Sequence, residues 1–280
     1  MRIGYVVLAY KSPAQLLRLI RRIADEESSI VVHVDRSTDS AVFREMSRAE
    51  AEVANVHFLR RQRTYWGGFG LVDATLRGIE YLVGGAVPVD YVFLLTGQDY
   101  PLRSRAAIDR VLRDADGRSF VHHSPIPYAG WGPQGGLNRL EKWHHVGSRR
   151  HRLTVPWKRK VPGGLQPYGG EAYWCLSGGT AAYVVAFARR NRRFVRFFKH
   201  VLIPDEIFFH TVVMNSPFRE DVVNDTLHFV DWDADPAPAI LTADHFERMV
   251  GSGKLFARKF DADTEGDVLD LLDDHIDRDA

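Results

Sequence analysis

A short apolar run in the first half of the chain constrains the fold most strongly. Residues 91–95 read YVFLL, five apolar side chains in succession with no polar residue between them. An unbroken run of this length is typical of a strand that is buried on both faces of a sheet. The run ends at Thr96-Gly97-Gln98-Asp99, where the glycine allows the backbone to turn sharply.

Two polar residues, Gln98 and Asp99, therefore follow the end of a predicted central strand. Ligands of open α/β sheets bind beyond the carboxyl ends of the strands, so both residues are candidates for a ligand site. The alternative is that Asp99 only accepts hydrogen bonds from the backbone of the turn. The stretch by itself leaves both interpretations open.

Strand-like and helix-like segments alternate over the rest of the chain. Further strands are predicted at 2–10, 30–35, 56–59, 119–123, 171–177, 226–232 and 255–260. Helices are predicted at 13–23 with Ser12 as cap, 40–52, 72–83, 104–115, 180–191, 192–200, 204–214, 242–250 and 264–275. This alternation predicts an α/β fold whose mostly parallel sheet is flanked by helices. We find no internal repeat, so residues 1–280 are predicted to form a single domain.

The segment 125–170 interrupts this pattern. It is rich in Pro, Gly, Trp, His and Arg, and loops of this length inside a domain are usually functional or disordered. Its tryptophans argue against disorder. Residues 139–160 carry eight Lys or Arg and a single acid, Glu141, although the net charge of the chain is only +1. Such a flap suits nucleic acid, an anionic membrane face or a sugar acceptor, and the alternative is a solvated basic loop.

The bulk composition restricts the compartment. Cys175 is the single cysteine, which rules out a disulfide within the chain and is compatible with a reducing compartment. Neither a signal peptide nor a membrane-spanning stretch is evident. We therefore expect a cytoplasmic protein, with peripheral contact of the basic flap to the inner face of the membrane as a further expectation.

Asp35 ends a predicted strand that also carries His33. Side chains at alternate strand positions point the same way, so the two could begin a metal site. The remaining ligands are not evident, and the pairs His122-His123 and His144-His145 lack zinc spacing. We predict that no metal is bound and that Asp35 accepts a hydrogen bond from a nucleotide base or ribose.

Two further motifs carry charge at positions suited to chemistry. In Pro204-Asp205-Glu206, proline opens a predicted helix and the carboxylates lie in its first turn, where the helix dipole keeps them ionised. An ionised carboxylate can take a proton from a sugar hydroxyl, although ordinary first-turn electrostatics is the alternative. Arg258 and Lys259 are adjacent in an apolar strand and suit phosphate oxygens, unless they only guard a sheet edge.

Four motifs in this order resemble one enzyme family, that of the core-2/I-branching β-1,6-N-acetylglucosaminyltransferases and peptide O-xylosyltransferases. They are DYVFLLTGQDYPL, GGEAYWCLSGGTAAYVV, PDEIFFHTVVMNSPF and LFARKFD. The resemblance implies a GT-A fold, a UDP-sugar donor, inversion at the anomeric carbon and no required metal. It also implies a nucleotide-binding half, 1–123, and an acceptor-binding and catalytic half, 124–280.

The resemblance also implies roles for individual residues. Glu206 matches the family's catalytic base. The diphosphate falls to Arg258 and Lys259, which take the place of a metal, since the central strand ends in one carboxylate rather than Asp-x-Asp. Nucleotide binding is assigned to Asp35, Gln98 and Asp99, and acceptor binding to Glu141, Trp143 and Asp205.

The predicted function is therefore that of an inverting, metal-independent glycosyltransferase without a cofactor. It would move N-acetylglucosamine or xylose from a UDP-sugar to a hydroxyl of a glycan, glycolipid or small glycoside. A glycoside hydrolase with two carboxylates is one alternative. The other is a binding module for nucleic acid or an anionic surface that uses the basic residues 139–160, which the near-zero net charge disfavours.

Overall fold

The computed structural model describes residues 1–147 and 152–279. The chain forms two compact units that alternate along the sequence. Unit 1 comprises Met1–Arg61, Val89–Gly117 and Leu227–Ala280, and unit 2 comprises Gln62–Pro88 and Arg118–Thr226. The last segment of the chain therefore belongs to the same unit as the first, and the division into halves at residue 123 stays a prediction.

Unit 1 is built on four parallel strands. In spatial order they are β4 (Tyr91–Thr96), β1 (Ile3–Ala9), β2 (Ser28–Val34) and β3 (Val56–Phe58). β4 is the apolar run from which the fold was predicted, and Tyr91 to Leu95 are all buried. Parallel strands covered on both faces require such apolar runs, and β1 and β2 are buried in the same way.

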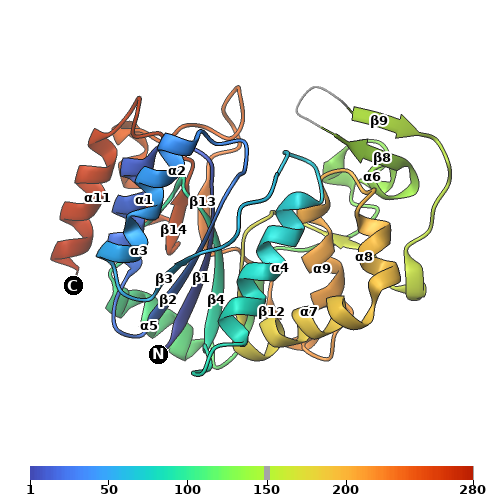
Figure 1. The fold of residues 1–280 in the computed structure, drawn as a ribbon, viewed down its shortest axis with the longest axis horizontal. Coiled ribbons are helices and arrows are strands. Elements are labelled where there is room, and N and C mark those ends of the chain that lie inside the picture. The colour runs from blue at the N-terminus through green and yellow to red at the C-terminus, as the bar shows by residue number, and fades with distance from the viewer. Residues whose placement is uncertain (148–151, 280) are drawn as a thin grey trace. The chain divides into compact units, whose positions relative to one another are not determined.

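Helices cover this sheet, as Figure 1 shows for α1 and its neighbours. The helices of unit 1 are α1 (Pro13–Ile23), α2 (Ser40–Ser47), α3 (Ala49–Glu52), α5 (Arg105–Asp114), α10 (Phe246–Gly251) and α11 (Asp267–Arg278). α1 and α11 lie side by side although they are far apart in the sequence, because Arg18 pairs with Asp270 and Asp273 at 2.6 and 2.7 Å. The C-terminal acidic helix is thereby tied to the first helix.

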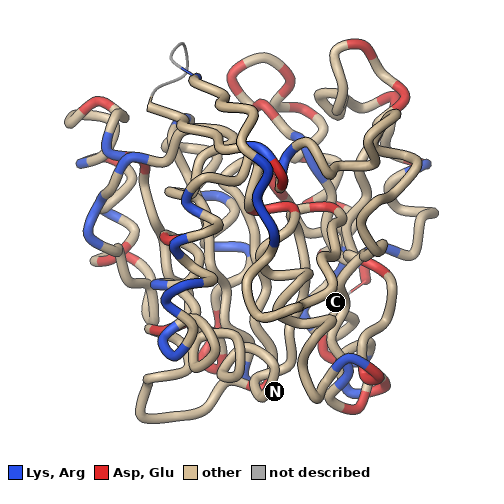
Figure 2. The backbone as a smooth tube through the Cα atoms, turned by 90° about the vertical axis from the view of Figure 1, so that its right-hand side faces the viewer, with Lys and Arg blue, Asp and Glu red and all other residues tan. Residues whose placement is uncertain are grey.

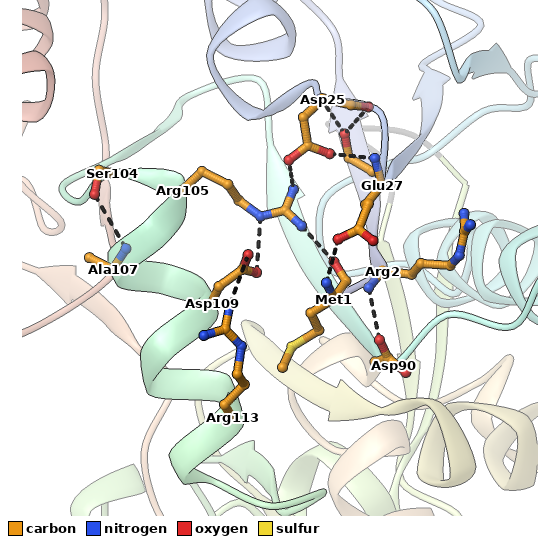
Figure 3. Close-up of polar contacts among 11 residues, drawn as sticks. Met1, Arg2, Asp25, Glu27, Asp90, Ser104, Arg105, Ala107, Asp109 and Arg113 are labelled. Carbon is orange, nitrogen blue, oxygen red and sulfur yellow. Dashed lines mark hydrogen bonds and ion pairs between the residues drawn. The ribbon is translucent and has the colours of Figure 1, made fainter. Parts of the chain in front are cut away.

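Polar contacts pin the amino ends of the strands (Figure 3). The Arg105 guanidinium donates to the Met1 carbonyl at 2.6 Å and also contacts the Asp25 carboxylate. The Arg2 amide donates to Asp90 Oδ2 at 2.8 Å. These contacts join the starts of β1, β2, β4 and α5 at the amino edge of the sheet. A ligand site is expected at the opposite, carboxyl edge.

A second, three-stranded sheet lies in the same unit. Its strands, in order, are β13 (His228–Val230), β14 (Phe256–Arg258) and β5 (Asp99–Pro101). β14 runs antiparallel to β5 and places Arg258 opposite Asp99. Asp99 and Arg258 are far apart in the sequence, and the pairing of the two strands holds them opposite one another.

Unit 2 contains the other helices and several short strands. Its helices are α4 (Gly70–Val83), α6 (Leu137–Glu141), α7 (Gly178–Arg190), α8 (Arg192–Phe198) and α9 (Phe208–Met214). Its strands are β6 (Ser119–Val121), β7 (Ser124–Pro125), β8 (Trp143–Val146), β9 (Arg152–Val155), β10 (Tyr168–Gly169), β11 (Trp174–Ser177) and β12 (Val222–Val223).

Within unit 2, β6 pairs with β11 antiparallel and with β12 parallel. The core between the helices is aromatic: the rings of Phe194, Phe198 and Phe208 lie within 5.4 Å of one another between centroids. Part of the flap forms the antiparallel hairpin β8–β9, and residues 148–151 between these strands lie outside the described residues.

The predicted α/β class, with a mostly parallel sheet flanked by helices, is confirmed. Several details differ, and the last helix, α11, for example begins at Asp267 rather than at 264. The helix predicted at 40–52 is divided into α2 and α3, and the strand predicted at 171–177 begins only at Trp174. Ser12 has a φ of 55° and its hydroxyl donates to Asp263 at 2.7 Å, so its side chain does not cap α1.

Another difference concerns the turn that carries Glu206. Pro204–Glu206 is a 3-10 turn, and α9 begins only at Phe208 because Ile207 has a φ of −132°. The expectation that the carboxylates lie in the first turn of an α-helix is therefore wrong. The protonation of the two carboxyl groups is therefore set by the residues around them and not by the dipole of an α-helix.

Candidate functional site

Three polar residues lie at the carboxyl edge of the sheet in unit 1. Tyr10 follows β1, Asp35 follows β2 and Gln98 follows β4. The Tyr10 hydroxyl donates to Gln98 Oε1 at 3.2 Å, and the Asp35 amide donates to the Ala9 carbonyl at 2.9 Å. The sequence assigned two of these residues to a nucleotide, and the fold brings the three strand ends together.

Asp35 is buried, and its Oδ1 accepts hydrogen bonds from the Ser37 amide at 2.6 Å and from the Ser37 hydroxyl. This arrangement is an Asx-type turn, in which a carboxylate caps the backbone that follows it. The turn fixes the carboxylate at the end of β2. A contact of Asp35 with the uridine stays a prediction.

The turn after β4 is locked to the end of β14. Gln98 Nε2 donates to the Phe260 carbonyl at 3.1 Å, and the Phe260 amide donates to the Gln98 carbonyl at 2.9 Å. The buried Gln15 of α1 donates to the Gly97 carbonyl at 3.0 Å. Sequence reasoning missed Gln15, which no motif marks as more than a helical residue. Three distant segments therefore meet beside Arg258 and Lys259.

Asp99 is fully buried and its carboxylate is engaged on both oxygens. Oδ2 accepts from the Thr96 amide at 2.7 Å and Oδ1 from the Thr96 hydroxyl at 2.9 Å, while Arg258 Nε lies 3.2 Å from Oδ1. This geometry favours the alternative raised from the sequence, a residue that caps its own turn, and it adds an ion pair that braces Arg258. Direct nucleotide contact by Asp99 stays a prediction without structural support.

Lys259 differs from Arg258 in its surroundings. Over residues 1–147 and 152–279, its ammonium forms no ion pair, and the residue contributes only its carbonyl, which accepts from the Leu241 amide at 2.9 Å. Lys259 as a residue is half-buried, and an ammonium without a counter-charge among the described residues suits an anionic ligand. In the described part of the chain, no group of three or more His, Cys, Asp or Glu is arranged to hold a metal ion. Independence of a metal stays a prediction.

Glu206 lies in the 3-10 turn Pro204–Glu206 of unit 2. Its Oε2 accepts a hydrogen bond from Arg139 Nη1 at 2.6 Å, and its side chain is 29% exposed. Burial raises the pKa of Glu206, and the Arg139 guanidinium counteracts this rise. The carbonyl of Glu206 accepts from the Gly170 amide at 3.0 Å, which ties the turn to the end of β10. The result is a partly accessible, oriented carboxylate.

The backbone before this turn is strained. Ile203 has a φ of 51°, a left-handed conformation that is an outlier for a β-branched residue. Its amide donates to the Gly67 carbonyl at 3.0 Å, which helps to hold the conformation. Strain of this kind clusters at functional sites, so its place three residues before Glu206 favours a functional role for the turn.

Asp205 lies in a different environment from its neighbour. Burial, together with repulsion from the Glu206 carboxylate, raises the pKa of Asp205 to about 7. Asp205 Oδ1 is buried and has no hydrogen-bond partner among the residues that the structure describes. Two adjacent carboxyl groups whose environments set them apart can hold different protonation states at neutral pH.

The predicted acceptor residues Glu141 and Trp143 are placed differently. Glu141 is exposed at the end of α6. The Trp143 ring is stacked between His145 and His200, at 6.0 and 4.5 Å between centroids, so imidazoles cover its faces. Trp66 is 58% exposed instead, and sequence reasoning assigned it no role.

The basic flap is anchored rather than merely solvated. Figure 2 shows Lys and Arg gathered in blue runs on several segments of the backbone. Arg159, within Lys158-Arg159-Lys160, donates to the carbonyls of Phe197 and His200 at 2.6 and 2.7 Å. Part of the positive charge of the flap therefore serves the packing of unit 2. In the described segments, no helix combines the length and apolar character needed to cross a bilayer.

Comparisons with known proteins agree on one family. The family model of the Core-2/I-Branching enzyme matches residues 3–250. Xylosyltransferase 2 of Rattus norvegicus is 28% identical over 297 residues, which cover 98% of this chain and 34% of the relative. Xylosyltransferase oxt of Drosophila melanogaster is 27% identical over 222 residues, covering 78% of this chain and 25% of the relative. The chain thus spans about a third or less of these relatives' length.

A solved structure with a detectable likeness is S. aureus TarS, residues 1–349. The TM-score is 0.35 at 15% identity, with coverage of 69% of this chain and 49% of the other. A likeness this low says nothing about substrates.

Proposed function

Because the chain belongs to the Core-2/I-Branching enzyme family, we propose that it is a glycosyltransferase that moves a sugar from a UDP-sugar to an acceptor hydroxyl. The observation that carries the proposal is Glu206, a carboxylate with one oxygen held by Arg139 and part of its side chain exposed. A general base needs such an orienting partner together with access to the proton that it removes. The similarity to xylosyltransferases makes UDP-xylose the first donor to test and UDP-N-acetylglucosamine the second.

The proposed reaction is a direct displacement. Glu206 accepts the proton of the acceptor hydroxyl while its oxygen bonds to the anomeric carbon of the donor sugar. The bond from that carbon to the diphosphate breaks, and its electron pair leaves with UDP. A single displacement inverts the anomeric centre, so an α-linked donor gives a β-linked product.

The leaving diphosphate requires positive charge. We assign this role to Lys259, which has no counter-charge in the described chain, and to Arg258, which Asp99 braces at 3.2 Å. Such groups stabilise charge where it grows during the reaction, so they can act without a divalent ion. Asp35, Tyr10 and Gln98 at the carboxyl edge of the sheet are the candidates for the nucleoside part of the donor.

The test is a donor panel. Release of UDP from UDP-xylose, UDP-N-acetylglucosamine and UDP-glucose is measured on the purified protein, with excess EDTA and without it, and with simple glycosides or serine-containing peptides as acceptors. We expect one donor to be turned over, and turnover to be unchanged by EDTA. Binding of none of these donors by calorimetry would contradict the proposed function. Loss of activity in EDTA that manganese restores would contradict its metal-free form.

A further inference from the structure

We propose that Arg139 is the positioning residue of Glu206: clamped on the Trp131 indole, its guanidinium holds one carboxylate oxygen and so presents the other to the acceptor hydroxyl. The inference rests on the proposed function for its chemical meaning. The clamp itself is a set of contacts within unit 2, and it can be tested without any sugar donor.

The contact between the two side chains is specific to one oxygen of the carboxylate. Arg139 Nη1 donates to Glu206 Oε2 at 2.6 Å, a short charge-assisted hydrogen bond. Oε1 accepts no hydrogen bond from the described residues, and part of the side chain is exposed. One oxygen is therefore fixed and the other is free to accept a proton.

Arg139 is itself held on its other side. Its guanidinium carbon lies 4.1 Å from the centroid of the Trp131 ring, within the range of a cation–π contact. The arginine backbone is held as well, because its carbonyl accepts from the Leu202 amide at 3.2 Å, close to the Glu206 turn. The guanidinium thus has little freedom to leave the carboxylate.

Two glycines make room for Trp131. A Cβ at Gly169 would lie 2.3 Å from Cη2 of the indole, and a Cβ at Gly136 would lie 2.5 Å from its Cε3. Gly136 also has a φ of 87°, which favours glycine. A Cβ at Gly169 would also lie 3.2 Å from the Glu206 carbonyl oxygen, so a side chain there would displace the indole and press on the Glu206 turn.

Two charged groups lie next to the Glu206 carboxylate. They are Asp205 in the same turn and Arg139 on α6. α9 carries His210, which is bonded through Nε2 to the Glu171 carbonyl at 2.9 Å. α4, also packed against the turn, carries Asp73 and Arg77, which pair with each other at 3.0 Å, and Glu80, which pairs with Arg189. Arg139 is thus the only cation found to counter the burial of this carboxylate in the described chain.

The clamp has a chemical consequence. When Glu206 Oε1 takes the acceptor proton, the carboxylate becomes neutral and its hydrogen bond to the Arg139 guanidinium weakens. The guanidinium therefore keeps the ground-state base ionised near neutral pH at the cost of some basicity. A cation within about 4–6 Å lowers a carboxyl pKa by about 1–3 units, so its removal should raise that pKa by a similar amount.

The experiment measures this titration directly. The carboxyl carbons of glutamates are labelled with ¹³C, and the Glu206 resonance is assigned by its disappearance in Glu206→Gln. We expect Arg139→Gln to move the midpoint of this titration upward by about one unit or more, that is, about tenfold or more in proton affinity. In Arg139→Lys, which keeps the positive charge, the midpoint of the titration should stay close to that of the wild type. Gly169→Ala should give a smaller upward shift.

Arg152→Gln is the matched control, because Arg152 also stacks on a tryptophan, Trp66 at 4.8 Å, but pairs with no carboxylate of residues 1–147 or 152–279. It should leave the Glu206 titration unchanged. In an active enzyme the acid limb of the pH dependence of kcat should move with the titration in Arg139→Gln, while KM for the donor changes little.

The two proposals can fail separately. A shifted titration in a protein that turns over no UDP-sugar supports the clamp and overturns the proposed function. An active enzyme in which neither the titration nor the acid limb moves in Arg139→Gln overturns the clamp. If Arg139→Gln does not fold, an unchanged titration in Gly169→Ala overturns it as well.

Discussion

At the scale of single residues, the adjacent carboxyl groups of Asp205 and Glu206 differ in hydrogen bonding and in exposure to solvent. Glu206 has a cation at 2.6 Å and partial access to solvent. Asp205 has a buried, unbonded oxygen, and its pKa is raised to about 7. A buried acid without a partner costs stability when it is ionised, and proteins retain such groups mostly at functional sites.

The raised pKa of Asp205 predicts a particular dependence of stability on pH. The folded state binds the proton more tightly than the unfolded state, whose pKa lies near the usual 3.8. Proton binding by Asp205 therefore favours the folded state fully below pH 3.8, and this contribution is lost as the pH rises from there to about 7. Asp205→Asn should stabilise the protein at pH 8 by about 1–3 kcal/mol and have little effect at pH 4.

Thermal unfolding at the two pH values measures this effect. Asp221→Asn is the control, since Asp221 is exposed in the same unit and has no ion pair among the described residues. Equal effects of Asp205→Asn at pH 4 and pH 8 would show that Asp205 gains its proton no more readily than an ordinary aspartate.

Asp35 allows a second prediction at this scale. Asp35→Ala removes a carboxylate at the carboxyl edge of the sheet, so UDP should bind about tenfold or more weakly, whichever sugar is attached. Calorimetry with UDP alone measures the loss. Unchanged affinity would mean that Asp35 serves only its turn with Ser37, to whose amide it is bonded at 2.6 Å.

At the scale of elements, the pairing of β14 with β5 decides where the basic pair lies. β14 sets Arg258 opposite Asp99, and the hydrogen bonds between Gln98 and Phe260 fix the residues that follow. The strand patterns predicted both segments but not their pairing, because register between distant strands depends on long-range packing. The ion pair of Asp99 with Arg258 could therefore not be read from either motif.

This element carries the prediction on metal-free charge stabilisation. Lys259→Ala should lower kcat by about 10²-fold or more, because the charge on the leaving diphosphate grows toward the transition state. UDP affinity should fall much less, and excess EDTA should have no effect on the wild type. Lys199→Ala, at an exposed lysine after α8, is the control. A kcat effect no larger than the affinity effect would place Lys259 in ground-state binding only.

At the scale of the whole molecule, the sequence predicted best the strands that are buried along their whole length. β1, β2 and β4 were predicted because strands buried on both faces must be apolar throughout. The Glu206 turn was predicted by position but not by conformation, since nothing local shows that Ile207 interrupts the helix. Arg139 lies in the five-residue helix α6, which is too short to show helical periodicity, and its stack on Trp131 arises only from the fold.

The most direct measurement of the central claim is the turnover of Glu206→Gln with the donor identified by the panel. Glutamine keeps the size and the hydrogen-bonding shape of the side chain but cannot take a proton at neutral pH. We predict that kcat for sugar transfer falls by about 10²–10⁴-fold while the Kd for the UDP-sugar changes little. Glu220→Gln, at an exposed glutamate of the same unit, should behave as wild type. Transfer by Glu206→Gln at a near-normal rate would contradict the assignment of Glu206 as the base.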